Sequence, residues 1–182
     1  MKNTTQHYGY LSIGLHWLIA LIVFGLFGLG DWMVGLGYYD PWYKTGPDLH
    51  KSIGIVLFIL MIVRVASRWL QIQPESLGSH TNVERKAGHA VHILLYILLF
   101  FIMISGYLIS TADGRGIEVF GLFTIPSLGE LFTNQEDLAG LAHEYAAYIV
   151  VGAALLHGLA AIKHHVIDKD NTLKRMLGHR QK

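Results

Sequence analysis

The sequence contains no cysteine among its 182 residues. Without thiolates the chain cannot form disulfides, bind haem through sulfur or hold an iron–sulfur cluster of its own. Charge is scarce as well: Asp, Glu, Lys and Arg make up 15% of the residues, whereas soluble domains carry about 25%. Hydrophobic residues make up 52%. This composition excludes an ordinary soluble domain and indicates a membrane protein.

Four apolar segments, at residues 11–34, 49–70, 87–110 and 138–165, are each long enough to cross a membrane. A helix needs about 20 apolar residues to span a hydrocarbon core of about 30 Å. The sequence therefore predicts an all-α integral membrane four-helix bundle that forms a single domain over residues 1–182.

The connections between these segments carry their own signals. Asp48 follows Pro47 and is expected to cap the second helix. Residues 71–85 read as a polar hinge. The longest connection, residues 111–137, is of a length that commonly carries a function or a lid.

Positive charge is distributed unevenly between the two sides. Eleven Lys and Arg residues, several of them in the C-terminal segment KDNTLKRMLGHRQK, fall on the side of both termini, against Lys44, Lys51 and Arg115 on the other. By the positive-inside rule both termini are cytoplasmic. A basic juxtamembrane cluster is explained more simply by anionic lipid than by nucleic acid, so we expect membrane lipid and no nucleic acid among the partners.

Four histidines, His16, His50, His143 and His157, lie on three of the apolar segments. The last two are fourteen residues apart, which on a helix closes nearly four turns and separates them by roughly 21 Å along one face. His16 begins the first segment and His50 the second, so each histidine of the last segment can meet a partner at its own depth. Two axial imidazoles saturate a haem iron and suit it to electron transfer. The spacing predicts two haems stacked across the bilayer.

Small residues surround both histidines of the last segment. Gly or Ala occupies every position three or four residues away, namely Ala139, Gly140, Ala146, Ala147, Ala153, Ala154, Ala160 and Ala161. Close helix packing also needs small residues, but their placement around both histidines favours a flat cofactor. A lone membrane histidine can simply bond a neighbouring helix, whereas four at two matched depths favour metal or haem. One tetrahedral zinc is excluded, because the pairs lie about four turns apart.

Two further side chains, those of Arg64 and His92, are expected near the cytoplasmic ends of their helices. Arg64 lies fourteen residues after His50 and is a candidate for pairing with haem propionates, with a snorkelling arginine as the alternative. His92 is a candidate for hydrogen bonding to a propionate or a quinone. His89 or His92 can also replace His16 as a ligand, and this alternative stays open.

His164 and His165 stand where the last segment leaves the membrane, beside Lys163. A quinone headgroup needs a proton donor when it is reduced, which makes both histidines candidates for quinone binding. The alternative is a solvated helix end.

Taken together, SIGLHW, LHKSIGI with MIVRVASR, AVHILLYILLF, LAHEYAAYIVVGAALLH and KDNTLKRM resemble bacterial cytochrome b561, a family of di-haem b-type cytochromes of the bacterial inner membrane. The resemblance covers nearly the full length and is weakest in the outer loops. It implies two haem b groups, an inner one with the axial ligands His16 and His157 and an outer one with His50 and His143.

The resemblance also implies a function. One branch of the family oxidises superoxide to oxygen at the outer side and reduces ubiquinone, which would make this chain an enzyme. The alternative is a non-catalytic cytochrome b subunit docked to a dehydrogenase or hydrogenase, with residues 111–137 as the docking surface. A structural membrane protein without a cofactor is disfavoured by the histidine spacing. The expected partners are membrane lipid, quinone and either superoxide or a redox protein, and homo-oligomer formation stays open.

Overall fold

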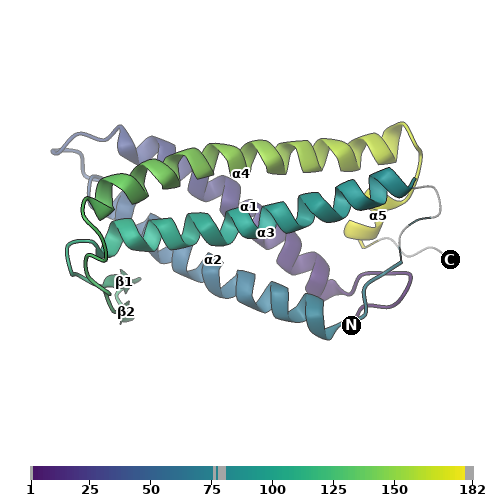
Figure 1. Ribbon diagram of the computed structural model, residues 1–182, viewed down its shortest axis with the longest axis horizontal. Coiled ribbons are helices and arrows are strands. Elements are labelled where there is room, and N and C mark those ends of the chain that lie inside the picture. Colours follow the sequence, from purple (N-terminus) through teal and green to yellow (C-terminus); the bar gives the residue numbers. More distant parts are fainter. Residues whose placement is uncertain (1, 76, 78–80, 179–182) are drawn as a thin grey trace. The chain divides into compact units, whose positions relative to one another are not determined.

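The computed structural model describes residues 2–75, 77 and 81–178. Within these residues the elements follow in the order α1 (Tyr10–Val34), α2 (Thr45–Leu70), α3 (Asn82–Thr111), β1 (Ile117–Val119), β2 (Phe123–Ile125), α4 (Gln135–Val166) and α5 (Thr172–Met176) (Figure 1). Each of the helices α1 to α4 is long and apolar enough to cross a membrane. The expected all-α membrane architecture is therefore confirmed, with a small hairpin and a short terminal helix added to it.

Helix α3 begins at Asn82, earlier than the apolar pattern predicts. The backbone N–H of Glu84 donates to Thr81 Oγ1 (3.2 Å), and the backbone N–H of Thr81 donates to the Glu84 carboxylate (2.9 Å). This reciprocal capping box satisfies N–H groups that no helical carbonyl can reach. The expected hinge over residues 71–85 therefore ends in a helix cap.

Helix α2 also begins early, at Thr45, so the expectation that Asp48 caps it was wrong. The backbone N–H groups of Gly46 and Asp48 already donate to carbonyls of the preceding loop, which carries the helical hydrogen bonds back past Pro47. Proline is tolerated there, because N–H groups of a first turn lack helical partners. Asp48 instead pairs with Lys51 (2.8 Å).

The chain forms two compact units, and each long helix contributes one segment to each of them. The first unit consists of Met1–Ala20, Leu60–Ile97 and Gly152–Lys182, and the second of Leu21–Ile59 and Leu98–Val151. The expected single domain over the whole chain stays a prediction. Each unit contains one of the histidine pairs expected from the sequence.

In the first unit, buried Asn3 joins the N-terminal segment to α1 and to the end of α2. Its side-chain oxygen accepts hydrogen bonds from the Gly9 N–H (2.7 Å) and the Ser12 hydroxyl (2.8 Å), and its own N–H donates to Gln71 (3.1 Å). A buried polar group is stable only when it is hydrogen-bonded in this way. The segment before α1 is therefore part of the folded unit.

The basic C-terminal segment is also attached to the first unit. The indole N–H of Trp17 donates to the Met176 carbonyl (2.8 Å), and Arg175 donates to the Glu75 carbonyl (2.7 Å). These bonds hold α5 against the start of α1 and the connection after α2. Lys174 remains exposed, as an anchor to anionic lipid requires.

In the second unit, the long connection after α3 contains the antiparallel hairpin β1–β2, which the sequence did not predict. Ile117 and Val119 are buried, and the Ser52 hydroxyl of α2 joins the hairpin by bonds to the Glu118 carbonyl (3.4 Å) and the Phe120 N–H (3.1 Å). A side chain at Gly116 would collide with the opposite strand, where its Cβ would lie 2.5 Å from the Ile125 carbonyl oxygen. The hairpin is thus fixed to α2.

The rest of this connection is held by Gln135 at the start of α4. Its amide donates to the Leu108 carbonyl (2.9 Å) and its oxygen accepts from the Leu131 N–H (2.7 Å), while the Ser127 hydroxyl donates to the Thr111 carbonyl (2.8 Å). These bonds join residues 127–135 to the end of α3, and the expectation that the connection carries a function or a lid stays a prediction.

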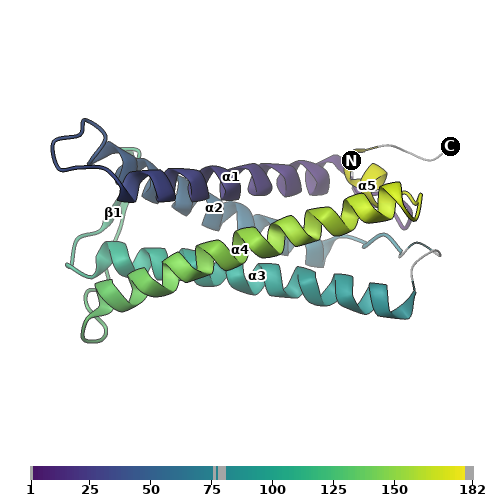
Figure 2. The same ribbon diagram turned by 90° about the horizontal axis from the view of Figure 1, so that it is seen from above.

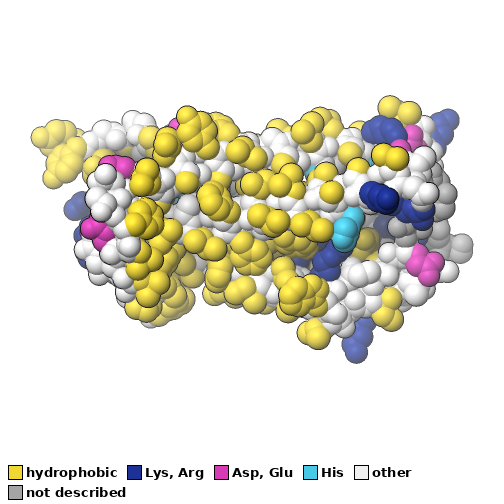
Figure 3. Space-filling model, in the orientation of Figure 1, with side chains coloured by type: hydrophobic (Ala, Val, Ile, Leu, Met, Phe, Trp, Pro, Cys, Tyr) yellow, Lys and Arg dark blue, Asp and Glu magenta, His cyan; other side chains and the backbone are white. Residues whose placement is uncertain are grey.

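Hydrophobic side chains cover the flanks of the long helices on the face drawn in Figure 3. Leu21 and Leu156 are 70% and 69% exposed, respectively, and Met61 is fully buried. Figures 1 and 2 both show α4 running beside α3. Extensive exposed apolar surface on long helices is the arrangement expected of segments that face lipid.

Candidate functional site

In the second unit, His50 of α2 faces His143 of α4. Their ring centres are 6.2 Å apart, with the ring planes inclined by 67°. Two imidazoles on opposite sides of one metal ion, with metal–nitrogen bonds of about 2.0 Å and ring centres about 1.1 Å beyond each nitrogen, would have centres roughly 6.2 Å apart. The observed spacing matches this value.

In the first unit, His16 of α1 faces His157 of α4 in the same manner. The ring centres are 6.3 Å apart and the planes are inclined by 81°. All four histidines are half-buried. The two pairs therefore repeat one geometry, each with α4 as a common partner.

His143 makes hydrogen bonds that orient its ring. Its Nδ1 lies 2.9 Å from the Ile102 carbonyl oxygen and 3.2 Å from Ser105 Oγ, and the Ser105 hydroxyl itself donates to that carbonyl (2.9 Å). Both neighbours of Nδ1 are thus acceptors, so the proton resides on Nδ1. The other ring nitrogen, Nε2, is left with its lone pair free for a metal.

Glycines on neighbouring helices make room for the rings of the second pair. A Cβ added at Gly106 of α3 would lie 3.0 Å from His143 Cε1, and one at Gly30 of α1 would lie 3.2 Å from His50 Cε1. Sequence reasoning looked for small residues only beside each histidine on its own helix and missed both. The Ser-Gly pair at 105–106, inside an otherwise bulky apolar run, was the available signal.

The environment of His50 differs from that of His143. Its Nδ1 is buried, and among the described residues it has no hydrogen-bond partner. An unsatisfied polar atom in an apolar bundle is unfavourable unless something else binds the ring. Together with the ring spacing and the absence of cysteine, this makes the second pair a fit for bis-histidine haem.

Arg64 lies against the first pair, as its place on α2 suggested. Its Nη2 is 3.3 Å from His16 Nδ1, and its Nη1 donates to the Ser12 carbonyl (3.0 Å). Among the described residues no carboxylate forms an ion pair with it. The guanidinium is therefore a fixed positive charge beside one ring of the pair.

His92 of α3 approaches the same pair from another direction. Its ring centre is 5.0 Å from that of His157, which is too short for two imidazoles on opposite sides of a metal. This distance favours His16 over His92 as the residue that would bind a metal together with His157. His92 then lies at the side of the His157 ring. His89 is exposed and lies outside this arrangement.

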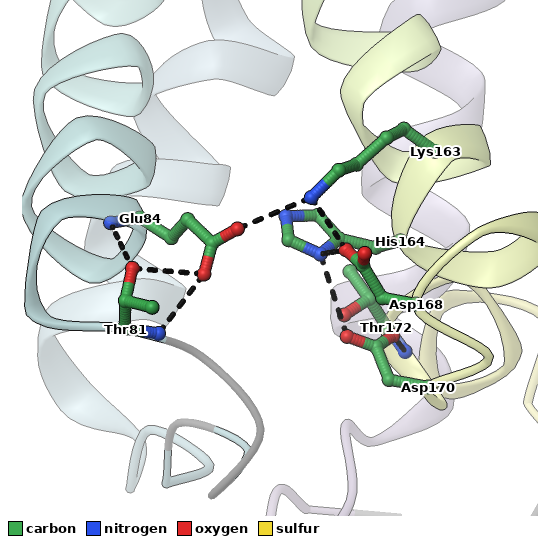
Figure 4. A network of polar contacts seen from close by, with 7 residues as sticks. All are labelled: Thr81, Glu84, Lys163, His164, Asp168, Asp170 and Thr172. Atoms are coloured by element: carbon green, nitrogen blue, oxygen red, sulfur yellow. Dashed lines mark hydrogen bonds and ion pairs between the residues drawn. The ribbon is translucent and has the colours of Figure 1, made fainter.

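At the end of α4, His164 takes part in a polar network that the sequence did not reveal (Figure 4). His164 Nδ1 is 2.7 Å from the Asp168 carboxylate and 3.5 Å from that of Asp170. Lys163 Nζ connects Asp168 (2.7 Å) to Glu84 of α3 (3.2 Å). The network thus joins α3, α4 and the turn before α5.

The neighbouring His165 has a different environment. Its Nδ1 is buried and has no hydrogen-bond partner among the described residues. The structure therefore separates two histidines that the sequence treated alike: one is held by carboxylates and the other has an unused ring nitrogen.

Glu84, His164 and Asp168 also offer three ligand atoms within 4.8 Å of one another. The ammonium of Lys163 already lies between the two carboxylates (Figure 4), so a metal ion would have to displace it. The arrangement is accordingly an ion-pair network in which the Lys163 ammonium occupies the place that a metal ion would take.

Two of the three cations expected on the outer side are neutralised by adjacent carboxylates. Lys51 pairs with Asp48, and Arg115 pairs with Asp113. Hydrogen bonds from the Arg115 side chain and backbone hold the pKa of Asp113 below its usual value, so the carboxylate stays charged near neutral pH. Lys44 has no ion pair among the described residues.

Four helices able to cross a membrane define a multi-pass membrane protein, and two facing pairs of half-buried histidines lie among these helices. A family model described as prokaryotic cytochrome b561 matches residues 7–179. The chain therefore belongs to the prokaryotic cytochrome b561 family of membrane electron-transfer proteins, which are b-type haem proteins.

Individual relatives agree with this assignment. Cytochrome b561 homolog 2 of Escherichia coli (strain K12) is 52% identical over 97% of this chain and 94% of its own length. Probable superoxide oxidase CybB of Yersinia pestis is 31% identical, over 94% of this chain and 96% of its own. Cytochrome b562 of Cereibacter sphaeroides is 28% identical, over 95% of this chain and 98% of its own.

The contact between Gly106 and the His143 ring leads to the first prediction. We expect Gly106→Val to displace this ring and to remove one haem, the one in the second unit, from the purified protein. The matched control is Gly25→Val, because a Cβ at Gly25 meets no atom within 4 Å. Absorbance spectra with haem quantification compare the two variants, and equal haem content would contradict the placement.

Proposed function

We propose that the chain binds two haem b groups, an inner one between His16 and His157 and an outer one between His50 and His143. The observation that carries the proposal is the agreement of both ring spacings, 6.3 and 6.2 Å, with bis-histidine ligation of one metal ion. A haem with both axial positions filled supplies one-electron transfer without binding oxygen.

The remaining polar groups of the first unit complete this proposal. Arg64 and His92 are placed beside the inner pair, where a guanidinium and an imidazole can receive haem propionates. The orientation of the chain in the bacterial inner membrane follows from its charge distribution, which places both termini in the cytoplasm. The first unit then lies on the cytoplasmic side, where Lys174 faces anionic lipid.

Ubiquinone is the proposed electron acceptor, bound beside the inner pair near His164 and His165. Its reduction to quinol takes up two electrons and two protons. His165 offers an unpartnered ring nitrogen to the headgroup, and His164, held by Asp168, is placed to pass a proton inward from a partly exposed carboxylate. On the opposite side, the described residues show no comparable group of histidines.

Superoxide is the proposed electron donor at the outer side. Each superoxide loses one electron and becomes oxygen, so two of them supply the electrons for one quinone. Support comes from the relative named probable superoxide oxidase, which matches over nearly its full length. With Lys51 and Arg115 paired to carboxylates, Lys44 is the outer cation best placed to attract the anion.

The alternative is an electron-transfer subunit that receives electrons from a docked dehydrogenase or hydrogenase. It is favoured by the ordered connection after α3, which exposes Leu122 (80%), Leu128 (69%) and Leu131 (59%). A fixed surface with exposed apolar side chains is typical of a binding interface.

Stopped-flow mixing of the oxidised, haem-loaded protein with superoxide tests the donor. We expect rapid reduction, seen in the haem absorbance, with a rate that falls as ionic strength rises. Lys44→Ala should slow the reaction several-fold, whereas Lys51→Ala, in which the lost cation was already paired, should change it less. No reduction by superoxide, together with copurification of a dehydrogenase or hydrogenase, would favour the docked subunit.

Reoxidation of the reduced protein by ubiquinone tests the acceptor site. We expect the double variant His164→Ala/His165→Ala to react about tenfold more slowly or worse, since proton donation and headgroup binding are both lost. Haem spectra and reduction from the outer side should stay unchanged. His89→Ala, which removes an exposed histidine of the same unit, serves as the control. Unaltered kinetics in the double variant would refute this placement, and a loss confined to variants of residues 111–137 would move the site outward.

A further inference from the structure

The two histidine pairs have the same ring spacing but different neighbours. In the second unit, the ring N–H of His143 donates to a backbone carbonyl and lies beside the Ser105 hydroxyl. In the first unit, the ring nitrogen of His16 faces the guanidinium of Arg64 at 3.3 Å. One pair is thus hydrogen-bonded to oxygen atoms with partial negative charge, and the other lies beside a full positive charge.

A hydrogen bond from a ligand N–H to a carbonyl gives the imidazole more basic character. A more basic ligand stabilises the iron more in its oxidised state, which carries one more positive charge. The bond from His143 to the Ile102 carbonyl would therefore lower the reduction potential of a haem held by this pair.

Arg64 acts in the opposite direction through its charge. In the structure Arg64 Nη2 lies within hydrogen-bond distance of His16 Nδ1 (3.3 Å), and a guanidinium can only donate. If Nε2 of His16 binds iron, Nδ1 carries the ring proton, and this contact is replaced by one between two donors. What remains is the repulsion between the guanidinium and the positive charge gained on oxidation, which is strong where burial reduces solvent screening. With no carboxylate of the described residues paired to it, Arg64 favours the reduced iron.

We propose that Arg64 makes the inner haem the higher-potential group of the pair, so that electrons are drawn from the outer side toward the proposed quinone site. This inference rests on the proposed haem ligands. Arg64 is in this account a residue that tunes and positions the inner ligand, held in place by its hydrogen bond to the Ser12 carbonyl. Asn3 supports that bond, because it accepts from the Ser12 hydroxyl.

A spectroscopic redox titration of the purified, haem-loaded protein tests the proposal. We expect two components in the wild-type curve, and we expect Arg64→Gln to shift only the higher one, to lower potential. Arg64→Lys, which keeps the charge, should shift it less. The matched control is Lys86→Gln, which removes an exposed cation of the same unit and should leave both components nearly in place.

A higher component that stays unchanged in Arg64→Gln, or a shift confined to the lower component, would overturn the proposal. Should Arg64→Gln fail to retain the inner haem, Arg64→Lys provides the second measurement. Because the positive charge is kept, its two components should stay apart, and a higher component that falls to the lower one would overturn the proposal. A protein with a single haem would instead refute the proposed ligand pairs, so the two failures are distinguishable.

Discussion

The structure depends on the need to satisfy imidazole rings inside an apolar helical bundle. A polar ring nitrogen without a partner is costly where water is absent, and this cost grows with each additional histidine. Here the rings face one another in pairs, at 6.2 and 6.3 Å, and α4 contributes one ring to each pair. Shared ligation of a metal would satisfy two rings at once, and Gly106 and Gly30 provide the space that the rings of the second pair need from the side.

Around this shared geometry, each unit supplies its own chemistry. In the second unit the polar partners of the His143 ring are a backbone carbonyl and a serine hydroxyl, and the hairpin of the connection after α3 is joined to α2. In the first unit the rings lie beside Arg64 and His92, and the same unit contains the ionisable network of Lys163, His164 and Asp168. A group of ionisable proton donors suits an acceptor that takes up protons, whereas a site without ionisable neighbours suits simple electron entry. The proposed direction of electron transfer follows from this difference.

The sequence predicted the features that depend on a repeated pattern along one chain segment. The four membrane helices follow from uninterrupted apolar runs, and the ring pairs were inferred from the fourteen-residue interval of His143 and His157. It did not predict what depends on contacts between distant segments: the packing of Gly106 against His143, the acceptors of the His143 ring, or the strands over 117–125. Short strands and hydrogen bonds across helices leave no periodic signal. Thr81 and Glu84 did carry a local signal, the spacing of a capping box, which was overlooked.

Paired histidine ligation is tested most directly by the amount of haem bound per chain. A pyridine haemochrome assay on the purified protein, set against an independent protein determination, should give a ratio near two b-type haems per chain. A reproducible ratio near one in fully loaded protein would contradict the claim that both histidine pairs hold a haem.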